Sequence, residues 1–241
     1  MDSLLTAAVF LLAGATKGLI GLGLPTVSVG LLALLMPPVE AAALLLVPAV
    51  VTNIVQIRGP ALHPILRRIW PMLLAMAPAT LVGSATLTGG GRLPLGLLGL
   101  ALILYAAWGL LAPPLRLSPR AERWSAVPIG LANGAVNGAT GVAVMPAVPW
   151  LGALGLTRDE MVQALGLAFL VATIALGAAL AWQGAITPVN ALGSLLALPP
   201  ALAGQWLGTR LRGQVSPARF RTLFFAALLA LGAQLAWRGF G

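Results

Sequence analysis

The sequence contains no cysteine, one histidine and one tyrosine, and few charged residues of either sign. The absence of cysteine excludes disulfide bonds, thiolate metal sites and cysteine catalysis. Only 8% of the 241 residues are charged and 59% are hydrophobic, so the chain lacks the polar side chains that a water-exposed surface requires. This composition excludes a soluble globular domain and indicates an integral membrane protein.

Acidic residues are the scarcest charged type, and five of them against fourteen basic residues give a net charge of +9. In a soluble protein that excess would suggest nucleic-acid binding. Here the basic residues lie in short loops between apolar stretches of roughly 20 residues, the length of a transmembrane helix. Such loops are typical of the cytoplasmic side of a membrane. The charge pattern therefore predicts a lipid bilayer as partner, and no nucleic acid.

The two halves of the chain repeat one another. Residues 14–21 align with residues 134–141, and in the same register Leu34 aligns with Leu154. A repeat of this kind indicates that the chain arose by duplication. We divide it into a first membrane repeat (1–115), a cytoplasmic linker (116–124) and a second membrane repeat (125–241).

Each repeat contains four apolar elements, of which the first is long and interrupted by glycines. The long elements are residues 4–36 and 125–156. The plainer helices are predicted at residues 41–57, 69–87 and 93–111 in the first repeat, and at residues 161–182, 189–209 and 222–237 in the second.

Three arginine clusters indicate how the long elements run. They are Arg58, Arg67 and Arg68; Arg116, Arg120 and Arg123; and Arg210, Arg212, Arg219 and Arg221. If the second long element crossed once, the last cluster would lie outside the cell, whereas an element that enters and returns keeps every cluster inside. We therefore predict an all-α integral membrane protein of two inverted repeats, each a re-entrant or broken helix hairpin plus three transmembrane helices, eight membrane elements in all. The alternative is one long tilted helix at each place, which gives eight plain crossings and a parallel repeat.

Inverted repeats with discontinuous helices are typical of secondary transporters, which bind their substrate near the middle of the membrane. An intramembrane enzyme would need a nucleophile with a base, yet the apolar stretches contain no Ser-His, Asp-Asp or His-metal combination. His63, the one histidine, is expected in a basic loop and not at a catalytic or metal site. We predict no enzymatic activity and no cofactor.

The break in the first long element has the features of an anion site. Gly21 and Gly23 allow the chain to turn, and Pro25 suits the first turn of a new helix. The N–H groups and positive dipole end of that helix favour a negative ligand. Lys17, the one charged residue within an apolar stretch, adds a full positive charge at a cost of about 2.5 to 3.5 kcal/mol at the bilayer centre. Alternatively, Lys17 reaches an interface or rests on backbone carbonyls.

The second break carries Asn137 in the place of Lys17, and Thr140 follows one helical turn later. The two polar breaks are expected to face one cavity, which Asn53 and Gln56 of another helix also reach. The candidate substrate-binding residues are Thr16, Lys17, Gly18, Gly21, Gly23, Asn53, Gln56, Asn137, Gly138, Thr140 and Gly141. A second interpretation of the glycine pairs 14/18 and 134/138 is that they are small-residue faces for helix packing, and both interpretations can hold together.

Two acidic residues, Glu40 and Glu160, also align between the repeats. Each is expected in the first turn of a helix, where a carboxylate complements the helix dipole. Residues 157–160 (Thr-Arg-Asp-Glu) match a capping box. We therefore predict structural roles for both.

The breaks, the size and the duplicated four-element halves together resemble the sulfite exporter TauE/SafE family, also called the toluene sulfonate uptake permease family. Members typically show Gly-x-Gly-Gly-Gly and then a proline in the first element of each half. Residues 21–25 (Gly-Leu-Gly-Leu-Pro) and residues 138–146 keep parts of that motif. The resemblance covers nearly the whole chain and implies transport of sulfite, sulfonates, thiosulfate or similar anions across a bacterial inner membrane. A permease for another solute such as a metal cation, and a non-transporting membrane scaffold, stay open as alternatives, as does assembly into a homo-oligomer.

Overall fold

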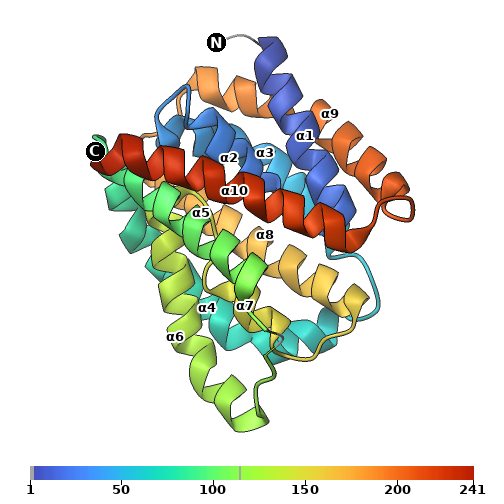
Figure 1. The fold of residues 1–241 in the computed structure, drawn as a ribbon. Helices are drawn as coiled ribbons and strands as arrows, with labels where there is room; N and C mark the ends of the chain where they lie inside the picture. Colours follow the sequence, from blue (N-terminus) through green and yellow to red (C-terminus); the bar gives the residue numbers. More distant parts are fainter. Residues whose placement is uncertain (1–2, 114) are drawn as a thin grey trace.

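A computed structural model describes residues 3–113 and 115–241, and within those ranges the chain forms ten α-helices and no strand (Figure 1). In chain order they are α1 (Ser3–Ile20), α2 (Leu24–Leu32), α3 (Pro38–Gln56), α4 (Leu62–Thr88), α5 (Leu93–Leu111), α6 (Pro119–Thr140), α7 (Ala147–Gly152), α8 (Arg158–Trp182), α9 (Pro188–Leu211) and α10 (Pro217–Phe240). The predicted all-α class is confirmed.

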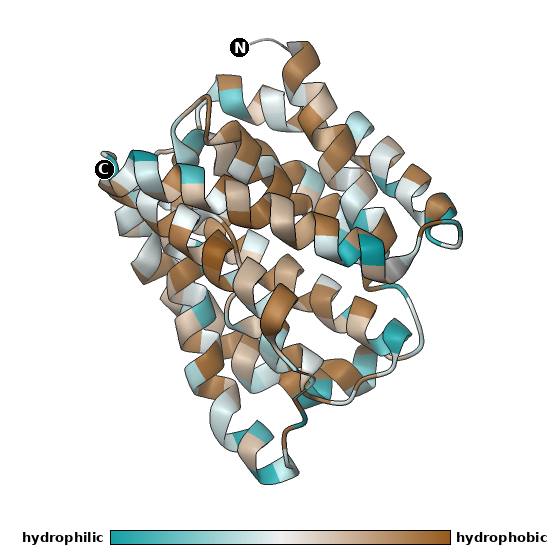
Figure 2. Ribbon diagram, in the orientation of Figure 1, coloured by the Kyte–Doolittle hydropathy of each residue, from teal (hydrophilic) through white to brown (hydrophobic). Residues whose placement is uncertain are grey.

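Five of these helices, α3, α4, α5, α8 and α10, are long and apolar enough to cross a membrane. Figure 2 shows hydrophobic residues along the middle of the bundle and hydrophilic residues gathered at helix ends and loops. Helix α9, in the part of the chain that the structure describes, does not meet this requirement of length and apolar content, although we expected it to cross the membrane. Polar residues such as Asn190, Ser194 and Gln205 dilute its apolar content.

Local capping explains where several helices begin. The Thr157 hydroxyl accepts a hydrogen bond from the Glu160 backbone N–H (3.4 Å), and the Glu160 carboxylate accepts one from the Thr157 N–H (2.8 Å). This reciprocal pair satisfies two N–H groups that the first turn would leave without partners. The predicted capping box is confirmed, and Glu40 likewise lies in the first turn of α3.

Both long elements are interrupted where the glycines lie. The first consists of α1 and α2, which meet at residues 21–23, and the second consists of α6 and α7, which meet at residues 141–146. Each long element is therefore a pair of helices.

Three helices begin earlier than the sequence predicts: α4 at Leu62, α6 at Pro119 and α10 at Pro217, where we expected residues 69, 125 and 222. His63, Arg67 and Arg68 therefore belong to a helix and not to a loop, and most of the expected linker 116–124 forms the first turns of α6. Hydropathy marks only the apolar part of a helix, whereas backbone hydrogen bonding continues into water. Proline in a first turn does not interrupt it, because that N–H has no partner within the helix.

Helices from opposite halves pack together in matching pairs. Helix α1 packs against α9, and α6, which corresponds to α1, packs against α4, which corresponds to α9. Helices α3 and α8 contact each other, as do α5 and α10, and each of these pairs joins corresponding helices. Exchanging the two halves therefore reproduces these helix pairs.

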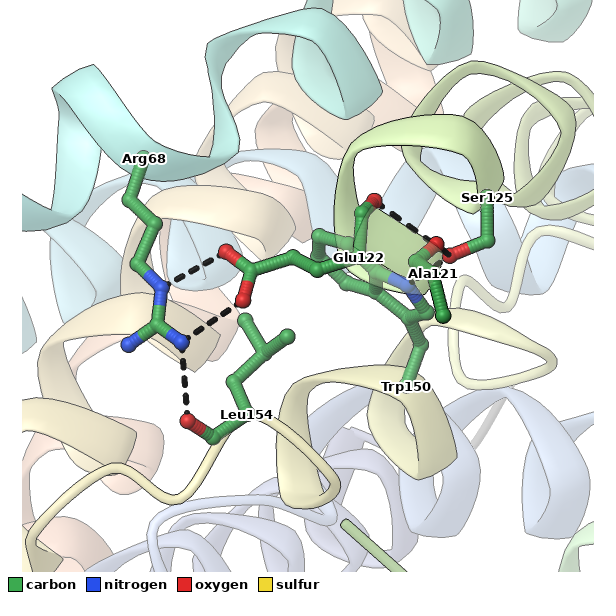
Figure 3. A network of polar contacts seen from close by, with 6 residues as sticks. All are labelled: Arg68, Ala121, Glu122, Ser125, Trp150 and Leu154. Carbon is green, nitrogen blue, oxygen red and sulfur yellow. Dashed lines mark hydrogen bonds and ion pairs between the residues drawn. The ribbon is translucent and has the colours of Figure 1, made fainter. Parts of the chain in front are cut away.

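The loops that follow α3 and α9 lie at the same end of the bundle, toward the right in Figure 1, whereas the loop after α2 and the C-terminus lie toward the left. We call the right-hand end, which carries Arg58, Arg158, Arg212 and Arg219 in or beside its loops, the arginine-rich end. Figure 3 shows a polar network that includes Arg68 of α4.

In this network Arg68 Nε and Nη2 donate to the two carboxylate oxygens of Glu122 on α6, each at 2.7 Å, and Nη2 also donates to the Leu154 carbonyl at 2.9 Å (Figure 3). Beside it, the Trp150 ring N–H donates to the Ser125 hydroxyl at 2.7 Å. These contacts hold the segment around α7 against α4 and α6.

Candidate functional site

The first break turns on two glycines in the left-handed region of backbone conformation. Gly21 has φ 80° and Gly23 has φ 112°, values that a side chain disfavours. Helix α2 begins at the next residue, with Pro25 in its first turn as predicted. The sequence therefore folds here into a sharp helix-to-helix connection of three residues.

The second break is organised by polar side chains as well as by glycine. Gly141 ends α6 with φ 77°, and the Thr140 hydroxyl accepts a hydrogen bond from the Val142 N–H (3.2 Å). The Asn133 side-chain oxygen accepts one from the N–H of Ala147, the first residue of α7 (3.1 Å). Thr140 and Asn133 thus satisfy backbone groups that the break exposes inside the protein.

Each break lies against the helix that follows the interrupted element of the opposite half, α8 for the first break and α3 for the second. A Cβ atom added to Gly21 would lie 3.3 Å from Cγ2 of Val162 on α8, and one added to Gly141 would lie 2.9 Å from Cβ of Ala42 on α3. Val162 and Ala42 are corresponding residues in the alignment of the two halves. The two breaks are therefore packed in the same way.

The Lys17 side chain is only 3% exposed and points from α1 to α3. Its ammonium group donates to the Thr52 hydroxyl at 3.0 Å and to the side-chain oxygen of Asn53. Within residues 3–113 and 115–241 the structure contains one ion pair, Arg68–Glu122, so no carboxylate there pairs with Lys17. Lys17 is therefore a buried cation surrounded by neutral oxygens, and it neither reaches an interface nor rests on backbone carbonyls.

One turn further along α3, Gln56 joins the first break to the second half. Its side-chain N–H groups donate to the Gly21 carbonyl (2.8 Å) and to the Val162 carbonyl (2.9 Å). Its side-chain oxygen is buried, and no described residue donates to it. Gln56 thus leaves one buried acceptor open beside the break.

In the second half, Asn137 takes the position of Lys17 and reaches a corresponding target. Its side-chain N–H groups donate to the Ala172 carbonyl on α8 (3.0 Å) and to the Thr80 hydroxyl on α4 (3.3 Å). Ala172 corresponds to Thr52, which receives Lys17 in the first half. The framework is repeated, but the group at its centre here is uncharged.

The two remaining candidate glycines lie in helix contacts. A Cβ on Gly18 would lie 2.2 Å from the Gln205 carbonyl oxygen of α9, and one on Gly138 would lie 2.3 Å from the Thr80 carbonyl oxygen of α4. Gly14 and Gly134 show the same closeness, so the packing interpretation of these pairs holds in the structure. Thr16 donates to the Leu12 carbonyl of its own helix (2.9 Å).

At the arginine-rich end the bundle contains a cavity of about 670 Å³. It lies between the first break, α5, α7 and the first turns of α8 and α10, and its lining includes Ile20, Leu22, Tyr105, Trp108, Val148, Val162, Arg158, Arg212 and Arg221. Lys17 and Asn137 do not line it. The walls are mostly apolar, and the three arginines supply the charge.

Two of these arginines are held by helix ends. Arg212 donates from Nε (3.0 Å) and Nη2 (2.6 Å) to the Gly18 carbonyl in the last turn of α1. Arg221 donates from the same two atoms to the Gly109 carbonyl in the last turn of α5, at 3.1 and 2.8 Å. Burial, with a contribution from the nearby positive charge of Arg158, lowers the pKa of Arg212. The nearby Asp159 carboxylate acts in the opposite direction on that pKa. The charged residues in the cavity lining itself are the three arginines.

Comparison with protein families supplies the identity of the chain. The family model described as Sulfite exporter TauE/SafE matches residues 6–235. The chain belongs to the sulfite exporter TauE/SafE family. Comparison with curated proteins and with solved structures returns no match. As a member of this sulfite exporter family with five helices suited to crossing a membrane, it is a multi-pass membrane protein of a transporter family.

The structure brings some of the predicted site residues of this TauE/SafE protein together and keeps others apart. Lys17 contacts Asn53, and Gln56 contacts Gly21, whereas no hydrogen bond among the described residues joins Asn137 or Thr140 to these. Sequence reasoning did not assign Arg212, Arg221 or Tyr105 to a site. The sequence does place both arginines beside the α9–α10 loop. The positive-inside rule explains their presence there without a binding role, so the sequence alone did not indicate a site.

Proposed function

We propose that this TauE/SafE protein is a secondary transporter that carries small sulfur-containing oxyanions, such as sulfite, sulfonates or thiosulfate, across a bacterial inner membrane. The observation that carries the proposal is the environment of Lys17, a buried cation with neutral partners only. An uncompensated charge inside the membrane is costly, and an anion beside it relieves that cost. A transported anion is the natural counter-ion.

The breaks support this placement of the anion. Thr16 and Gly18 flank Lys17 near the end of α1, and Gly21 and Gly23 build the first break, after which α2 starts. Backbone N–H groups at a helix start favour negative ligands. The corresponding region of the second half, at the end of α6, contains Asn137, Gly138, Thr140 and Gly141. Transport requires that the anion pass from one side of the membrane to the other between the two breaks.

The proposed topology is an inverted repeat in which α1–α2 and α6–α7 are hairpins that enter from opposite sides. It is supported by the exchange of packing pairs between the halves. It is also supported by direction: in Figure 1, α5 runs toward the arginine-rich end, whereas the corresponding α10 starts there. By the positive-inside rule the arginine-rich end is cytoplasmic.

The topology can be tested directly, because the chain has no cysteine and single cysteines can be introduced without background. Cysteines at Arg67 and Arg219 should react with an impermeant maleimide from the cytoplasmic side only. A cysteine at Leu35, between α2 and α3, should react only from the other side. Reaction of the first two from opposite sides would rule out the inverted topology.

The function is tested by flux. Purified protein in liposomes should accumulate sulfite, thiosulfate or a sulfonate down an imposed gradient, and the anion that is carried should also raise the thermal unfolding temperature, since a ligand that binds the folded state stabilises it. Absence of flux for every anion, with correctly inserted protein, would indicate a scaffold. Flux of a divalent metal cation in place of the anions would refute the proposal.

A further inference from the structure

The cavity at the arginine-rich end holds cationic groups that the Lys17 site does not use. Arg158, Arg212 and Arg221 all line it, and they come from the start of α8, the end of α9 and the start of α10. Three separate helix ends thus direct positive charge to one mouth. No acidic residue appears in its lining among the described residues.

The two carbonyl-bound arginines keep donors free. Arg212 and Arg221 each use Nε and Nη2 on a single carbonyl oxygen, and no hydrogen bond within residues 3–113 and 115–241 engages the Nη1 group of either. A guanidinium group has five N–H donors. Each side chain is therefore fixed in direction while part of its donor set stays available to an oxyanion.

A second polar group in the cavity wall also lacks a partner. The hydroxyl of Tyr105 is fully buried, the residue lines the cavity, and no described residue hydrogen-bonds with that hydroxyl. A buried hydroxyl without a partner costs about 1 to 3 kcal/mol, so such groups in folded proteins usually have a ligand or water partner. The ring packs on Phe225 and Trp108, which makes the wall around it aromatic.

We propose that this cavity is a second oxyanion-binding site, separate from Lys17, in which Arg212, Arg221 and Tyr105 hold the charged head of a ligand whose apolar portion lies against Trp108, Val148 and Leu165. The volume of about 670 Å³ accommodates an anion with an organic body, which an inorganic oxyanion alone would leave unfilled. Both a soluble organic anion and the headgroup of an anionic lipid have this chemistry. The site does not depend on whether Lys17 binds an anion.

The position of Arg212 gives the site a consequence for the first break. Arg212 is bound to the Gly18 carbonyl, and Gly18 directly follows Lys17. An oxyanion bound to the free Nη1 group of Arg212 leaves that contact in place. One side chain then joins the ligand in the cavity to the end of α1 that carries Lys17.

The test uses a single cysteine in the cavity wall, Ala112→Cys, in the full chain held in nanodiscs. Ala112 is half-buried and lines the cavity, whereas Ala61, equally half-buried in the loop before α4, does not, so Ala61→Cys is the control. The probe is benzenesulfonate, and benzenesulfonamide is its uncharged analogue. In phosphatidylcholine nanodiscs, benzenesulfonate should slow maleimide labelling of A112C but not of A61C, and benzenesulfonamide should do neither.

Variants separate the two sites. Replacing both arginines, Arg212→Gln with Arg221→Gln, should raise the half-protecting concentration by about tenfold for each charge-assisted hydrogen bond lost. Tyr105→Phe, which breaks no existing hydrogen bond and should fold normally, should raise it by about threefold. Arg238→Gln removes an arginine–carbonyl contact (to Leu34) outside the cavity and should leave protection unchanged, as should Lys17→Gln.

Changing the lipid of the nanodiscs distinguishes the two sources of the anion, a soluble molecule and a lipid headgroup. If nanodiscs with cardiolipin protect A112C without added sulfonate, and the arginine variants abolish that protection, the site holds a lipid headgroup. If protection requires benzenesulfonate, the site takes a soluble anion. The proposal would be overturned if neither benzenesulfonate nor cardiolipin protected A112C. It would also be overturned if protection survived the loss of both arginines and of the tyrosine hydroxyl, or if protection were lost in Lys17→Gln. Loss of transport in Lys17→Gln with protection intact would leave this site standing and bear only on the Lys17 proposal.

Discussion

The Lys17 and Asn137 regions show how two copies of one framework diverge in chemistry. Both residues lie one turn before a helix break, and both reach corresponding positions of α3 and α8, the Thr52 hydroxyl and the Ala172 carbonyl. Lys17 is charged and partnered by neutral side chains, whereas Asn137 is neutral and its side-chain N–H groups bridge α6 to α4 and α8. The duplicated backbone determines where a polar group stands, and the side chain there determines whether it can attract an anion.

The glycine contacts show the opposite behaviour, because they are the same in both halves. Gly18 against α9 and Gly138 against α4 are equally close to a backbone carbonyl. Helices inside a membrane gain little from hydrophobic burial and depend on close backbone approach, so this geometry tolerates little change. Packing has been kept in both halves while charge has been confined to one.

The largest effect is expected from Lys17→Ala. Removing one member of a buried charge pair costs about 2 to 5 kcal/mol in binding, so anion affinity should fall by roughly a thousandfold. The protein should still insert and fold, since the variant removes an uncompensated buried charge. Calorimetric titration with the transported anion checks the affinity, and gel filtration with circular dichroism checks the fold. Unchanged affinity would show that the Lys17 and Asn137 regions do not differ in their contribution to anion binding.

The next effect concerns the shared packing. Gly18→Ala and Gly138→Ala each place a methyl group within about 2.3 Å of a backbone oxygen, so each should destabilise the protein by up to about 3 kcal/mol. Thermal unfolding in detergent measures this. Gly213→Ala is the matched control, because a Cβ there meets nothing within 4 Å. Strong destabilisation by only one of the two variants would break the equivalence of the halves.

A smaller effect is expected for Asn137→Leu. The variant removes two hydrogen bonds and leaves Ala172 and Thr80 with their own helical bonds, which suggests a loss of about 1 to 2 kcal/mol of stability. Anion affinity should fall by less than tenfold. Measuring the anion affinity of this variant alongside that of Lys17→Ala tests the prediction. A loss of affinity as large as that of Lys17→Ala would mean that the Lys17 and Asn137 regions both bind the anion.

The smallest effect is expected at the polar network of Figure 3. The carbonyls of Leu154 and Leu34 correspond, and each accepts from an arginine, but only Arg68 also binds a carboxylate. Arg68 is 38% exposed, so Arg68→Gln should cost about 0.5 to 1 kcal/mol and less at high salt. Arg238→Gln should cost less still. Chemical denaturation at low and high salt measures both, and a larger cost for Arg238→Gln would reverse the order.

Several features of the site were predictable from sequence because they depend on neighbouring residues alone. Gly21, Gly23 and Gly141 adopt backbone angles that favour glycine, and Pro25 starts a helix because it needs no N–H partner there. The capping box of Thr157 and Glu160 is equally local. The first turns of α4, α6 and α10 were not predicted, because hydropathy marks the edge of the apolar stretch and not the end of the hydrogen-bonded helix.

The sequence by itself determined that this protein lies in a membrane, that it is duplicated and that two of its apolar elements are interrupted, since composition, internal repetition and backbone preference are properties of the chain. Tertiary structure decided which groups meet: Lys17 with Asn53, Gly18 with α9, and Arg212 with the Gly18 carbonyl. These contacts join residues 36 to 194 positions apart. No local preference encodes such a partner, because it is set by how separate helices pack. For Gly18 and Arg212 those helices come from opposite halves, whereas Lys17 and Asn53 lie on two helices of the first half.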